Sequence, residues 1–476
     1  MRRRLRTPFV CFFCAGLVLA TSRGTAAFAD ATRWSTAVPL NRPGNFGWFP
    51  EVATDAAGGV HVFWSQGYAG LGGYDAVTYC QPHADGCSEW LDIAMRPVAG
   101  GSFLTRPAAA VDAEGMIHLL WRRKSIICYM AASARGPRTL PHWSRPRKLG
   151  EPGYYSTIAI DNQGTLHAAW SQGVFNQGAD CRGCADIFYS RSTDQGYIWS
   201  PPTNVSRTDW GSEKPQLAFG RDDTVYLAWE EGRDVGAGKG EPQSSMLAVS
   251  EDGGRTWERR ATFEQAGDAP QSIAVGVDGD GRVVVVWQQI RGERIFYQLS
   301  DDRGRSWSEP RHMVGLRTRW RRDYNKLDDY DMAVDPAGHL HLVLAGRSAS
   351  ATRRATEGND LDVFHVEWDG TKWLPAQSIF TTAGAPEWPR IAVANGNQLH
   401  AVWFERPAGY EWNTEEGQYR VWYARGETAA PALTPVVWPT PAPPSLSADE
   451  IGRIAQLVAA LVIFAAIVIV SRRLGW

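Results

Sequence analysis

The hydrophobic and polar positions of this chain alternate with a period of two residues, in a pattern that returns along its length. An apolar segment ending in Val-Asp or a close variant is followed by a glycine turn and by a second segment of the form Leu-His-x-x-Trp. The fullest copies are residues 109–112 with 117–121, and 158–161 with 166–170. Short alternating runs bounded by turn residues predict half-buried β-strands.

The residue that closes the second segment recurs at intervals of about 50 to 60 residues, a period typical of repeated supersecondary units. The seven copies end at Trp64, Trp121, Trp170, Trp229, Trp287, Leu344 and Trp403. A third apolar segment follows each copy, and a turn with a tryptophan often leads into a fourth. Four antiparallel strands per repeat are typical of a propeller blade. We therefore predict an all-β chain forming a seven-bladed β-propeller, with six blades as the alternative.

The two ends of the repeat region complement each other. The seventh repeat stops after its third strand near Ala424, whereas residues 33–40 resemble a fourth strand that lacks the first three. Pairing these two segments would close the ring and leave no exposed sheet edge. The propeller is therefore predicted over residues 30–427, closed by its N-terminal strand.

The N-terminal segment, residues 1–29, predicts a cleaved secretory signal. Arginines precede a short apolar run, and Ala27 and Ala29 provide small residues at the cleavage site. An uncleaved membrane anchor is the alternative, although the apolar run is short for a span.

The C-terminal segment predicts a stalk and a membrane anchor. Residues 428–446 contain six prolines and favour an extended chain. Residues 447–471 comprise a capping turn and an apolar transmembrane helix. The arginines in residues 472–476 place that tail in the cytoplasm by the positive-inside rule. We expect a single-pass protein of the cell membrane with its propeller outside.

Charge and cysteines narrow the range of partners. The formal net charge of −2 becomes more negative once the arginines of the signal are removed, which argues against nucleic acid as a partner. Outside the cytosol cysteines are expected to pair, Cys80 with Cys87 and Cys181 with Cys184, leaving Cys128 as a buried thiol. A redox or zinc role of the Cys181-x-x-Cys184 motif is the weaker alternative, because no second ligand pair accompanies it. No metal and no cofactor is predicted.

A second motif, Ser-x-Asp-x-Gly-x-x-Trp, lies between the third and fourth strands. Its carboxylate can accept hydrogen bonds from turn amides, its glycine can adopt a positive φ, and its tryptophan can pack under the turn. The complete copies consist of Ser192, Asp194, Gly196 and Trp199; Ser250, Asp252, Gly254 and Trp257; and Ser300, Asp302, Gly304 and Trp307. The motif resembles the Asp boxes, or BNR repeats, of sialidase-like propellers, and the resemblance spans about residues 33–425. It implies that these aspartates are structural and lie away from the active face.

Candidate ligand-binding residues follow from the geometry of a propeller, whose first strands line the central channel. The starts of these strands, and residues just after the second-strand tryptophans, should converge at one mouth. The candidates are Glu51, Arg106, Tyr155, Lys214, Gln216, Gln271, Tyr330, Asp331, Arg390, Glu230 and Glu405. A long loop of blade seven also carries side chains that suit contact with sugar or peptide, namely Tyr410, Glu411, Trp412, Glu415 and Tyr419. The alternative is that they are ordinary loop residues without a binding role.

The resemblance also implies a test for sialidase activity. Sialidases of this family clamp the substrate carboxylate with three arginines, the first of them in an Arg-Ile-Pro motif of the first blade. Here that place reads Trp48-Phe49-Pro50-Glu51, and a phenylalanine cannot pair with a carboxylate. Spacing assigns no catalytic residue elsewhere in the chain.

Five histidines recur at one repeat position, three residues before the closing residue. They are His61, His118, His167, His341 and His400. Because equivalent positions are spread around a ring, they cannot form one metal site. We expect them to pack or to bond the backbone.

Together these features favour a propeller displayed at the cell surface as a non-catalytic binding module for an extracellular glycan or protein. One alternative is an anchored glycoside hydrolase of sialidase type, resembling an exo-α-sialidase. Another is a structural assembly platform, because the fold alone does not determine function. The sequence predicts no oligomeric state.

Overall fold

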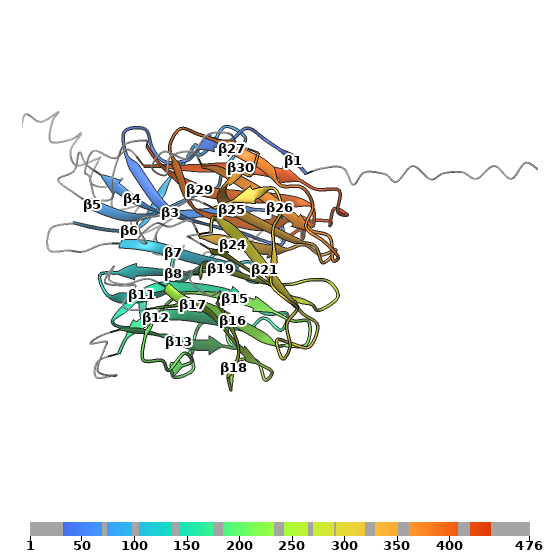
Figure 1. Ribbon diagram of the computed structural model, residues 1–476. Helices are drawn as coiled ribbons and strands as arrows, with labels where there is room; N and C mark the ends of the chain where they lie inside the picture. Colours follow the sequence, from blue (N-terminus) through green and yellow to red (C-terminus); the bar gives the residue numbers. More distant parts are fainter. Residues whose placement is uncertain are drawn as a thin grey trace, which may run out of the picture.

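Seven antiparallel β-sheets surround a common axis in the computed structural model (Figure 1). The described residues are 32–68, 74–97, 104–135, 142–174, 184–232, 242–264, 270–289, 292–318, 329–350, 361–407 and 419–438. The first strand of each sheet contacts the first strands of both neighbouring sheets, so the ring is complete. The predicted seven-bladed β-propeller is confirmed, and the six-bladed alternative is wrong.

Blades 1 to 4 each contain four strands, which run in chain order from the axis to the rim. Blade 1 contains β3 (Phe46–Thr54), β4 (Val60–Tyr68), β5 (Tyr74–Cys80) and β6 (Leu91–Pro97). Blade 2 contains β7 (Leu104–Val111), β8 (Met116–Arg123), β9 (Ile126–Ser133) and β10 (Arg147–Gly150). Blade 3 contains β11 (Gly153–Ile160), β12 (Leu166–Gly173), β13 (Ala185–Ser192) and β14 (Thr203–Asn204). Blade 4 contains β15 (Gly211–Phe219), β16 (Val225–Gly232), β17 (Pro242–Ser250) and β18 (Glu258–Phe263).

Blades 5 to 7 keep this order with two variations. Blade 5 contains β19 (Pro270–Val277), β20 (Val283–Gln289), β21 (Arg294–Ser300) and β22 (Arg311–His312). In blade 6 two segments, β23 (Leu316–Arg317) and β24 (Tyr330–Val334), both pair with β25 (Leu340–Ser348), which is followed by β26 (Asp362–Trp368) and β27 (Gln377–Thr381). Blade 7 contains β28 (Ala385–Ala394), β29 (Gln398–Arg406) and β30 (Arg420–Glu427), together with β1 (Arg33–Trp34) and β2 (Val38–Pro39).

The N-terminal strands close the ring as the sequence predicts. β1 pairs with β30 through Trp34 and Gly426, and β2 pairs with the same strand through Val38 and Tyr423. The closure continues past β2, because the amide of Leu40 donates to the carbonyl oxygen of Val421 at 2.8 Å. Blade 7 therefore takes its outermost strands from the opposite end of the chain, which joins the two termini of the propeller.

The apolar faces of the strands meet between adjacent blades. The hydrophobic clusters of the described residues join neighbouring blades, and the cluster between blades 7 and 1 also includes Tyr155 of blade 3. The residues that close the seven repeats are all buried within these clusters or beside them, with exposed fractions of 0–1 %. The repeat that reveals the fold is therefore a repeat of core positions.

The three complete Asp boxes form closely similar turns. In the first, the Ser192 hydroxyl donates to Asp194 at 2.7 Å and accepts from the amide of Gly196 at 2.9 Å, while Asp194 accepts from the amide of Ile198. The boxes of Asp252 and Asp302 repeat these bonds. Each of the three carboxylates accepts hydrogen bonds from the hydroxyl and amide groups of its own turn.

The tryptophan of each box packs against an aromatic side chain of the preceding blade. The rings of Trp199 and Tyr129 meet edge to face at 5.2 Å between centroids, and those of Trp257 and Tyr189 meet at 4.8 Å. Trp307 meets Phe263 in the same way at 4.9 Å. The boxes therefore connect neighbouring blades as well as closing their own hairpins.

The repeated histidines are buried in chains of side-chain hydrogen bonds. His118 contacts the Tyr129 hydroxyl through Nδ1 at 2.9 Å and the Asp112 carboxylate through Nε2 at 3.2 Å. Equivalent Asp–His–Tyr chains are built around His61 and His167, whereas His341 contacts His365 in place of a tyrosine. These histidines therefore bond to side chains and not to the backbone. Each series of hydrogen bonds connects three strands or turns of one blade.

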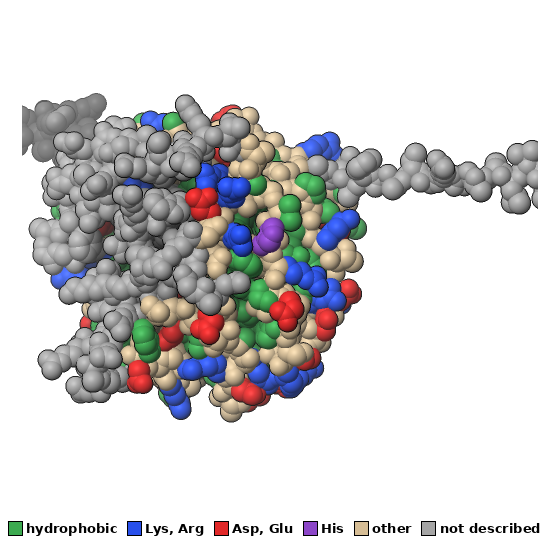
Figure 2. Space-filling view, in the orientation of Figure 1, with side chains coloured by type: hydrophobic (Ala, Val, Ile, Leu, Met, Phe, Trp, Pro, Cys, Tyr) green, Lys and Arg blue, Asp and Glu red, His purple; other side chains and the backbone are tan. Residues whose placement is uncertain are grey.

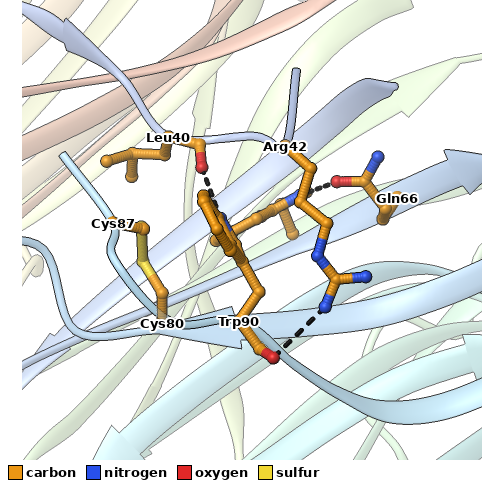
Figure 3. The surroundings of a disulfide bond; sticks show 7 residues. Leu40, Arg42, Gln66, Cys80, Cys87 and Trp90 are labelled. Atoms are coloured by element: carbon orange, nitrogen blue, oxygen red, sulfur yellow. Dashed lines mark hydrogen bonds between the residues drawn. A yellow bond between two sulfur atoms is a disulfide. The ribbon is translucent and has the colours of Figure 1, made fainter. Parts of the chain in front are cut away.

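A disulfide of blade 1 lies beside the hydrogen bonds that connect this blade to the segment after β2 (Figure 3). Cys80 and Cys87 form a disulfide. Close to it, the Trp90 indole donates to the Leu40 carbonyl oxygen at 2.7 Å, and Arg42 donates to the carbonyl oxygen of Trp90 at 3.2 Å. Cys128 is a buried free thiol. Cys184 is disulfide-bonded, while Cys181 lies outside the described residues.

The first part of the predicted stalk lies against the propeller. The amides of Thr428, Leu433 and Val436 donate to carbonyl oxygens in the turns between the first and second strands of blades 7 and 1. The segment ends at Trp438, whose ring lies 4.8 Å from the guanidinium carbon of Arg135 in blade 2. We call residues 428–438 the C-terminal strap, because they cross three blades.

The predicted signal and membrane anchor lie outside the described residues. Within the part of the chain that the structure describes, no helix is long and apolar enough to cross a membrane. The signal, the remainder of the stalk and the anchor therefore stay predictions.

Candidate functional site

The first strands carry β-bulges at equivalent positions of five blades. In blades 1, 2, 4, 5 and 7 the pairing of the first and second strands skips the tryptophan that closes the repeat. The residue that begins each bulge has a positive φ of 52–56°; these residues are Phe49, Arg106, Lys214, Ser272 and Trp388. Such backbone is unfavourable for residues other than glycine and is concentrated at functional sites, where bulges redirect side chains. The bulges mark a level of the ring at which the blades carry different side chains.

A cavity of about 210 Å³ opens at this level. Residues from all seven blades contribute to its wall. The charged and amide side chains among them are Glu51, Lys214, Gln216, Glu230, Asp329, Asp331 and Arg390, and the large aromatic ones are Tyr155 and Trp388. We call this cavity the funnel. Its wall combines hydrogen-bonding groups of both charges with flat apolar rings.

Two cations and several carboxylates form a network on the funnel wall. Lys214 Nζ lies 2.8 Å from Asp329 Oδ1 and 3.3 Å from Glu230 Oε1. Arg390 lies 3.7 Å from Asp329 and 3.9 Å from Glu51. Burial disfavours the charge on Lys214, but the attraction of Asp329 and Glu230 outweighs it and raises the pKa of the ammonium group. Lys214 therefore stays charged.

Two carboxyl groups of the funnel wall, those of Glu51 and Asp331, have raised pKa values. Burial raises the pKa of Glu51 to about 8, despite the attraction of Arg390. Burial likewise raises the pKa of Asp331, whose carboxylate accepts a hydrogen bond from the amide of Ile391 at 2.9 Å. At neutral pH Glu51 is mostly protonated and can donate a hydrogen bond or a proton to a ligand.

A second cationic cluster lies beside the funnel, at the start of blades 2 and 3. The guanidinium carbon of Arg106 lies 4.4 Å from the ring centres of Phe49 and Tyr154 and 4.7 Å from that of Tyr155. The guanidinium carbon of Arg122 lies 4.2 Å from the ring centre of Tyr154. Arg106 stands at the bulge of β7, and Arg122 directly follows the closing tryptophan of blade 2. Tyr155 belongs to both groups, since it also lines the funnel.

The sequence matches a family model described as a BNR repeat-like domain over residues 130–400. This match covers more than half of the chain. The chain belongs to the BNR repeat-like family. The structural Asp boxes of this BNR propeller, at residues 192–199, 250–257 and 300–307, all lie within the matched region.

Solved structures resemble the BNR propeller in fold. A protein of unknown function from Dyadobacter fermentans DSM 18053 has a TM-score of 0.51 at 14% identity, covering 84% of this chain and 100% of that one. The K499G mutant of NanB sialidase from Streptococcus pneumoniae has a TM-score of 0.46 at 13% identity, covering 83% and 71% of the two chains. A polysaccharide lyase of family PL25, an ulvan lyase, has a TM-score of 0.49 at 11% identity, covering 82% and 95%. No curated protein matches the sequence.

Most of the candidates named from the sequence meet at the funnel. Those on its wall are Glu51, Tyr155, Lys214, Gln216, Asp331, Arg390 and Glu230. Arg106 lies beside Tyr155, and Gln271 is buried next to the lining residue Ser272.

The remaining two candidates, like Arg106 and Gln271, do not line the funnel. Tyr330 is fully buried, and only its carbonyl oxygen approaches the site, accepting from Gln216 at 2.7 Å. Glu405 instead accepts from the Trp422 indole at 2.9 Å and from the Thr382 hydroxyl. Of the blade-seven loop residues, Tyr419 is described and packs against Trp48, while 410–415 lie outside the described residues.

Sequence reasoning missed four residues of this region: Arg122, Tyr154, Asp329 and Trp388. A signal existed for two of them. Arg122 follows the closing tryptophan of blade 2 as Glu230 follows that of blade 4. Trp388 precedes a proline as Arg106 and Lys214 do. Asp329 lies just before a first strand, and no motif distinguishes it.

Proposed function

We propose that the chain is a membrane-anchored, extracytoplasmic module whose funnel binds a glycan. One observation carries this proposal: side chains that differ from blade to blade meet in one cavity, to which all seven blades contribute. The wall of this cavity combines charged and aromatic groups. The repeated residues, by contrast, are engaged in turns and in the core. Sugar rings bind by stacking on flat aromatic faces and by hydrogen bonds from surrounding polar groups, and the funnel wall offers both.

The size of the funnel favours a small part of a larger ligand. Pockets for drug-sized molecules usually enclose about 300–1,000 Å³, whereas the funnel encloses about 210 Å³. We infer that it admits a single sugar ring or the end of a chain. The rest of the ligand would extend over the mouth, outside the funnel.

The C-terminal strap supports display of the funnel away from an anchor. It crosses the turns between the first and second strands, whereas the bulges lie towards the opposite ends of the first strands. A stalk that continues from Trp438 would therefore extend from the face of the propeller that lies opposite the funnel mouth. This arrangement suits a receptor whose site points outward from the cell surface.

A glycoside hydrolase is the second candidate, and Glu51 is the observation that favours it. A carboxyl group with a pKa of about 8 could act as a general acid. Against a sialidase stands Phe49, which packs edge to face on Trp388 and Phe404 at ring distances of 5.1 and 5.6 Å. The position expected for the first clamp arginine therefore holds an aromatic packing residue.

The experiment that tests the proposed function is a glycan array probed with the purified full-length chain. Arg390→Gln should abolish the binding, because its guanidinium lines the funnel. Arg311→Gln, at an exposed position of the rim strand β22, is the matched control and should bind normally. Binding that survives Arg390→Gln in a folded protein would place the ligand elsewhere and favour the assembly platform. Turnover of an aryl glycoside that is lost with Glu51→Gln would favour the hydrolase.

The surface visible in Figure 2 is consistent with recognition at a defined site. Lysine and arginine side chains are interspersed with aspartate and glutamate side chains on the described part of this face. Ion pairs at the surface of the propeller include those of Arg282 with Asp301 and of Arg303 with Asp222. A mixed surface of this kind supports solubility and does not attract polyanions broadly.

A further inference from the structure

The C-terminal strap limits the distance between the propeller and the predicted membrane anchor. Amides of the strap are hydrogen-bonded to turns of blades 7 and 1, and the strap ends on blade 2 at Trp438. The indole of Trp438 packs on the hydrophobic cluster of blades 1 and 2 and lies over the guanidinium group of Arg135. Residues 439–446 separate it from the predicted helix and its entry turn at 447–471. A segment of this length spans at most about 29 Å when fully extended, so such an anchor would hold the strap close to the bilayer.

The face of the propeller that carries the strap also exposes large apolar side chains. Val437 of the strap is 91% exposed, and Leu433 is 51% exposed. Tyr197 and Ile198, in the turn of the first Asp box, are 70% and 73% exposed. Because successive strands of a blade are antiparallel, the turn between the third and fourth strands lies at the same end of the blade as the turn between the first and second. The strap and the Asp-box turns therefore lie on one face, opposite the funnel mouth, which we call the strap face.

The first Asp box differs from the other two complete boxes in its exposed residues. The pair between the glycine and the tryptophan is Tyr-Ile in the first box, Arg-Thr in the second and Arg-Ser in the third. The first box also packs on blade 2, where the strap ends. The ring of Trp199 meets that of Tyr129, and Arg147 donates to the carbonyl oxygen of Tyr197 at 2.6 Å. The apolar pair is therefore found in the box that neighbours the end of the strap.

The turn of the first box fixes the backbone that carries these two side chains. The Asp194 carboxylate accepts from the amide of Ile198 at 2.8 Å, in addition to the contact of Arg147 with Tyr197. Single exposed apolar residues are common on proteins, whereas several on one face mark an interaction surface. Tyrosine is enriched where a membrane meets water. Apolar side chains on a fixed turn can enter that region with little loss of backbone freedom.

Arginines of the third Asp box, on the same face, already have carboxylate partners. Arg303 forms an ion pair with Asp222, and Arg305 forms one with Glu251. Paired charges attract anionic lipids less than a cluster of free lysine or arginine side chains does. Contact of the strap face with a bilayer would therefore be mainly apolar, and zwitterionic lipid would suffice for it.

We propose that the strap face lies against the lipid headgroups of the bilayer, with Tyr197, Ile198 and Val437 in contact with lipid. The inference rests on the membrane anchor in the proposed function and adds a fixed orientation to it. The short segment after Trp438 brings the strap face to the bilayer, and the apolar side chains keep it there. The funnel mouth then points away from the membrane, where it meets ligands from the surroundings.

The test places a fluorophore on each face of the full-length chain in phosphatidylcholine nanodiscs. Ile198→Cys provides the labelling site on the strap face. Val314→Cys is the matched control, because Val314 is 83% exposed and lies between β22 and β23, on the side of the funnel mouth. Lipid with a nitroxide on its headgroup should quench the fluorophore at position 198 and leave the one at position 314 bright. Wild type treated with the same reagent corrects for reaction of the buried Cys128.

Variants test whether the apolar pair keeps the strap face on the bilayer. In a chain labelled through Val437→Cys, the combination of Tyr197→Ser and Ile198→Ser should reduce quenching by the headgroup nitroxide. Arg255→Ser, at the position of the second Asp box equivalent to Tyr197, is the control and should leave the quenching unchanged. Because the replaced side chains are exposed and lie opposite the funnel mouth, the melting temperature and the binding of glycans should not change.

Each outcome decides the proposal. Fluorophores at positions 198 and 314 that are quenched equally, or not at all, in a chain that co-elutes with nanodiscs would overturn the inference and leave the anchor intact. A full-length chain that does not enter nanodiscs would overturn the anchor and the inference together, while glycan binding is measured separately. Quenching at position 437 that the double serine variant leaves unchanged would overturn the role of the apolar pair.

Discussion

Replacing Gly196 with alanine tests the claim that the Asp boxes lock neighbouring blades together. Gly196 has a φ of +82°, and an added Cβ would overlap the hydroxyl of Tyr129 in the preceding blade. That hydroxyl is bonded to His118, which is in turn bonded to Asp112. The substitution therefore strains the turn and pushes on a buried chain of hydrogen bonds at the same time.

The expected cost has two parts. A left-handed backbone costs a non-glycine residue about 1–2 kcal/mol. Displacing Tyr129 leaves buried polar groups of His118 unsatisfied, which costs about 1–3 kcal/mol more. Gly164→Ala isolates the first part, because Gly164 has a φ of +79° in the same blade and nothing lies within 4 Å of its added Cβ. We expect Gly196→Ala to lower the free energy of unfolding by about 2–5 kcal/mol, and Gly164→Ala by about 1–2 kcal/mol.

Urea unfolding of the full-length chain, followed by tryptophan fluorescence, measures both variants. A clear difference in midpoint between Gly196→Ala and Gly164→Ala supports the lock between blades. Equal midpoints would refute the reasoning, because the box would then contribute only its own hairpin. The Gly254→Ala variant should behave like Gly196→Ala, since its Cβ would overlap the Tyr189 hydroxyl in the same way.

Three further predictions follow from the strap, the funnel and blade 1. Trp438→Ala should destabilise the propeller by about 1–2 kcal/mol through lost apolar burial, while Val437→Ala, 91% exposed, should be neutral in the same urea assay; equal effects would mean that the strap does not stabilise the ring. Because the folded pKa of Glu51 is about 8 and its ordinary value is 4.5, the folded state binds the proton more tightly, and stability from this group falls as pH rises between these values. The free energy of unfolding of the wild type should therefore fall by up to about 1.4 kcal/mol per pH unit in this window, relative to that of Glu51→Gln. Free energies of unfolding that change with pH in parallel for the two proteins would contradict the raised pKa. The purified chain should release no fluorophore from a fluorogenic sialoside, because Phe49 occupies the place of a clamp arginine; turnover would contradict this expectation.

The sequence predicts the architecture well because its signals are repeated. Each blade needs a large buried residue at one second-strand position, so Trp64, Trp121 and their equivalents recur at the period of the fold. The spare strand at residues 33–40 and the missing one after β30 are visible for the same reason. Each is a departure from a pattern that the other copies establish.

The functional region is predicted less well because its residues are the ones that differ between blades. Lys214 and Arg106 can be found from their place before a proline in a first strand, but their carboxylate or aromatic surroundings cannot. Asp329 reaches Lys214 from a segment 115 positions away. The prolines of residues 428–446 predict an extended chain but not its contacts with the propeller. Turns of blades 7 and 1 offer carbonyl partners to the C-terminal strap, and Arg135 of blade 2 contacts Trp438.

The central claim is that the ligand is a glycan bound in the funnel by side chains that differ between blades. A crystal structure of the protein with a bound oligosaccharide tests this claim most directly. We predict that a sugar ring lies in the funnel against Tyr155 or Trp388, within hydrogen-bonding distance of Arg390. An oligosaccharide bound at the Asp-box turns or at the outer strands, with the funnel unoccupied, would contradict the account.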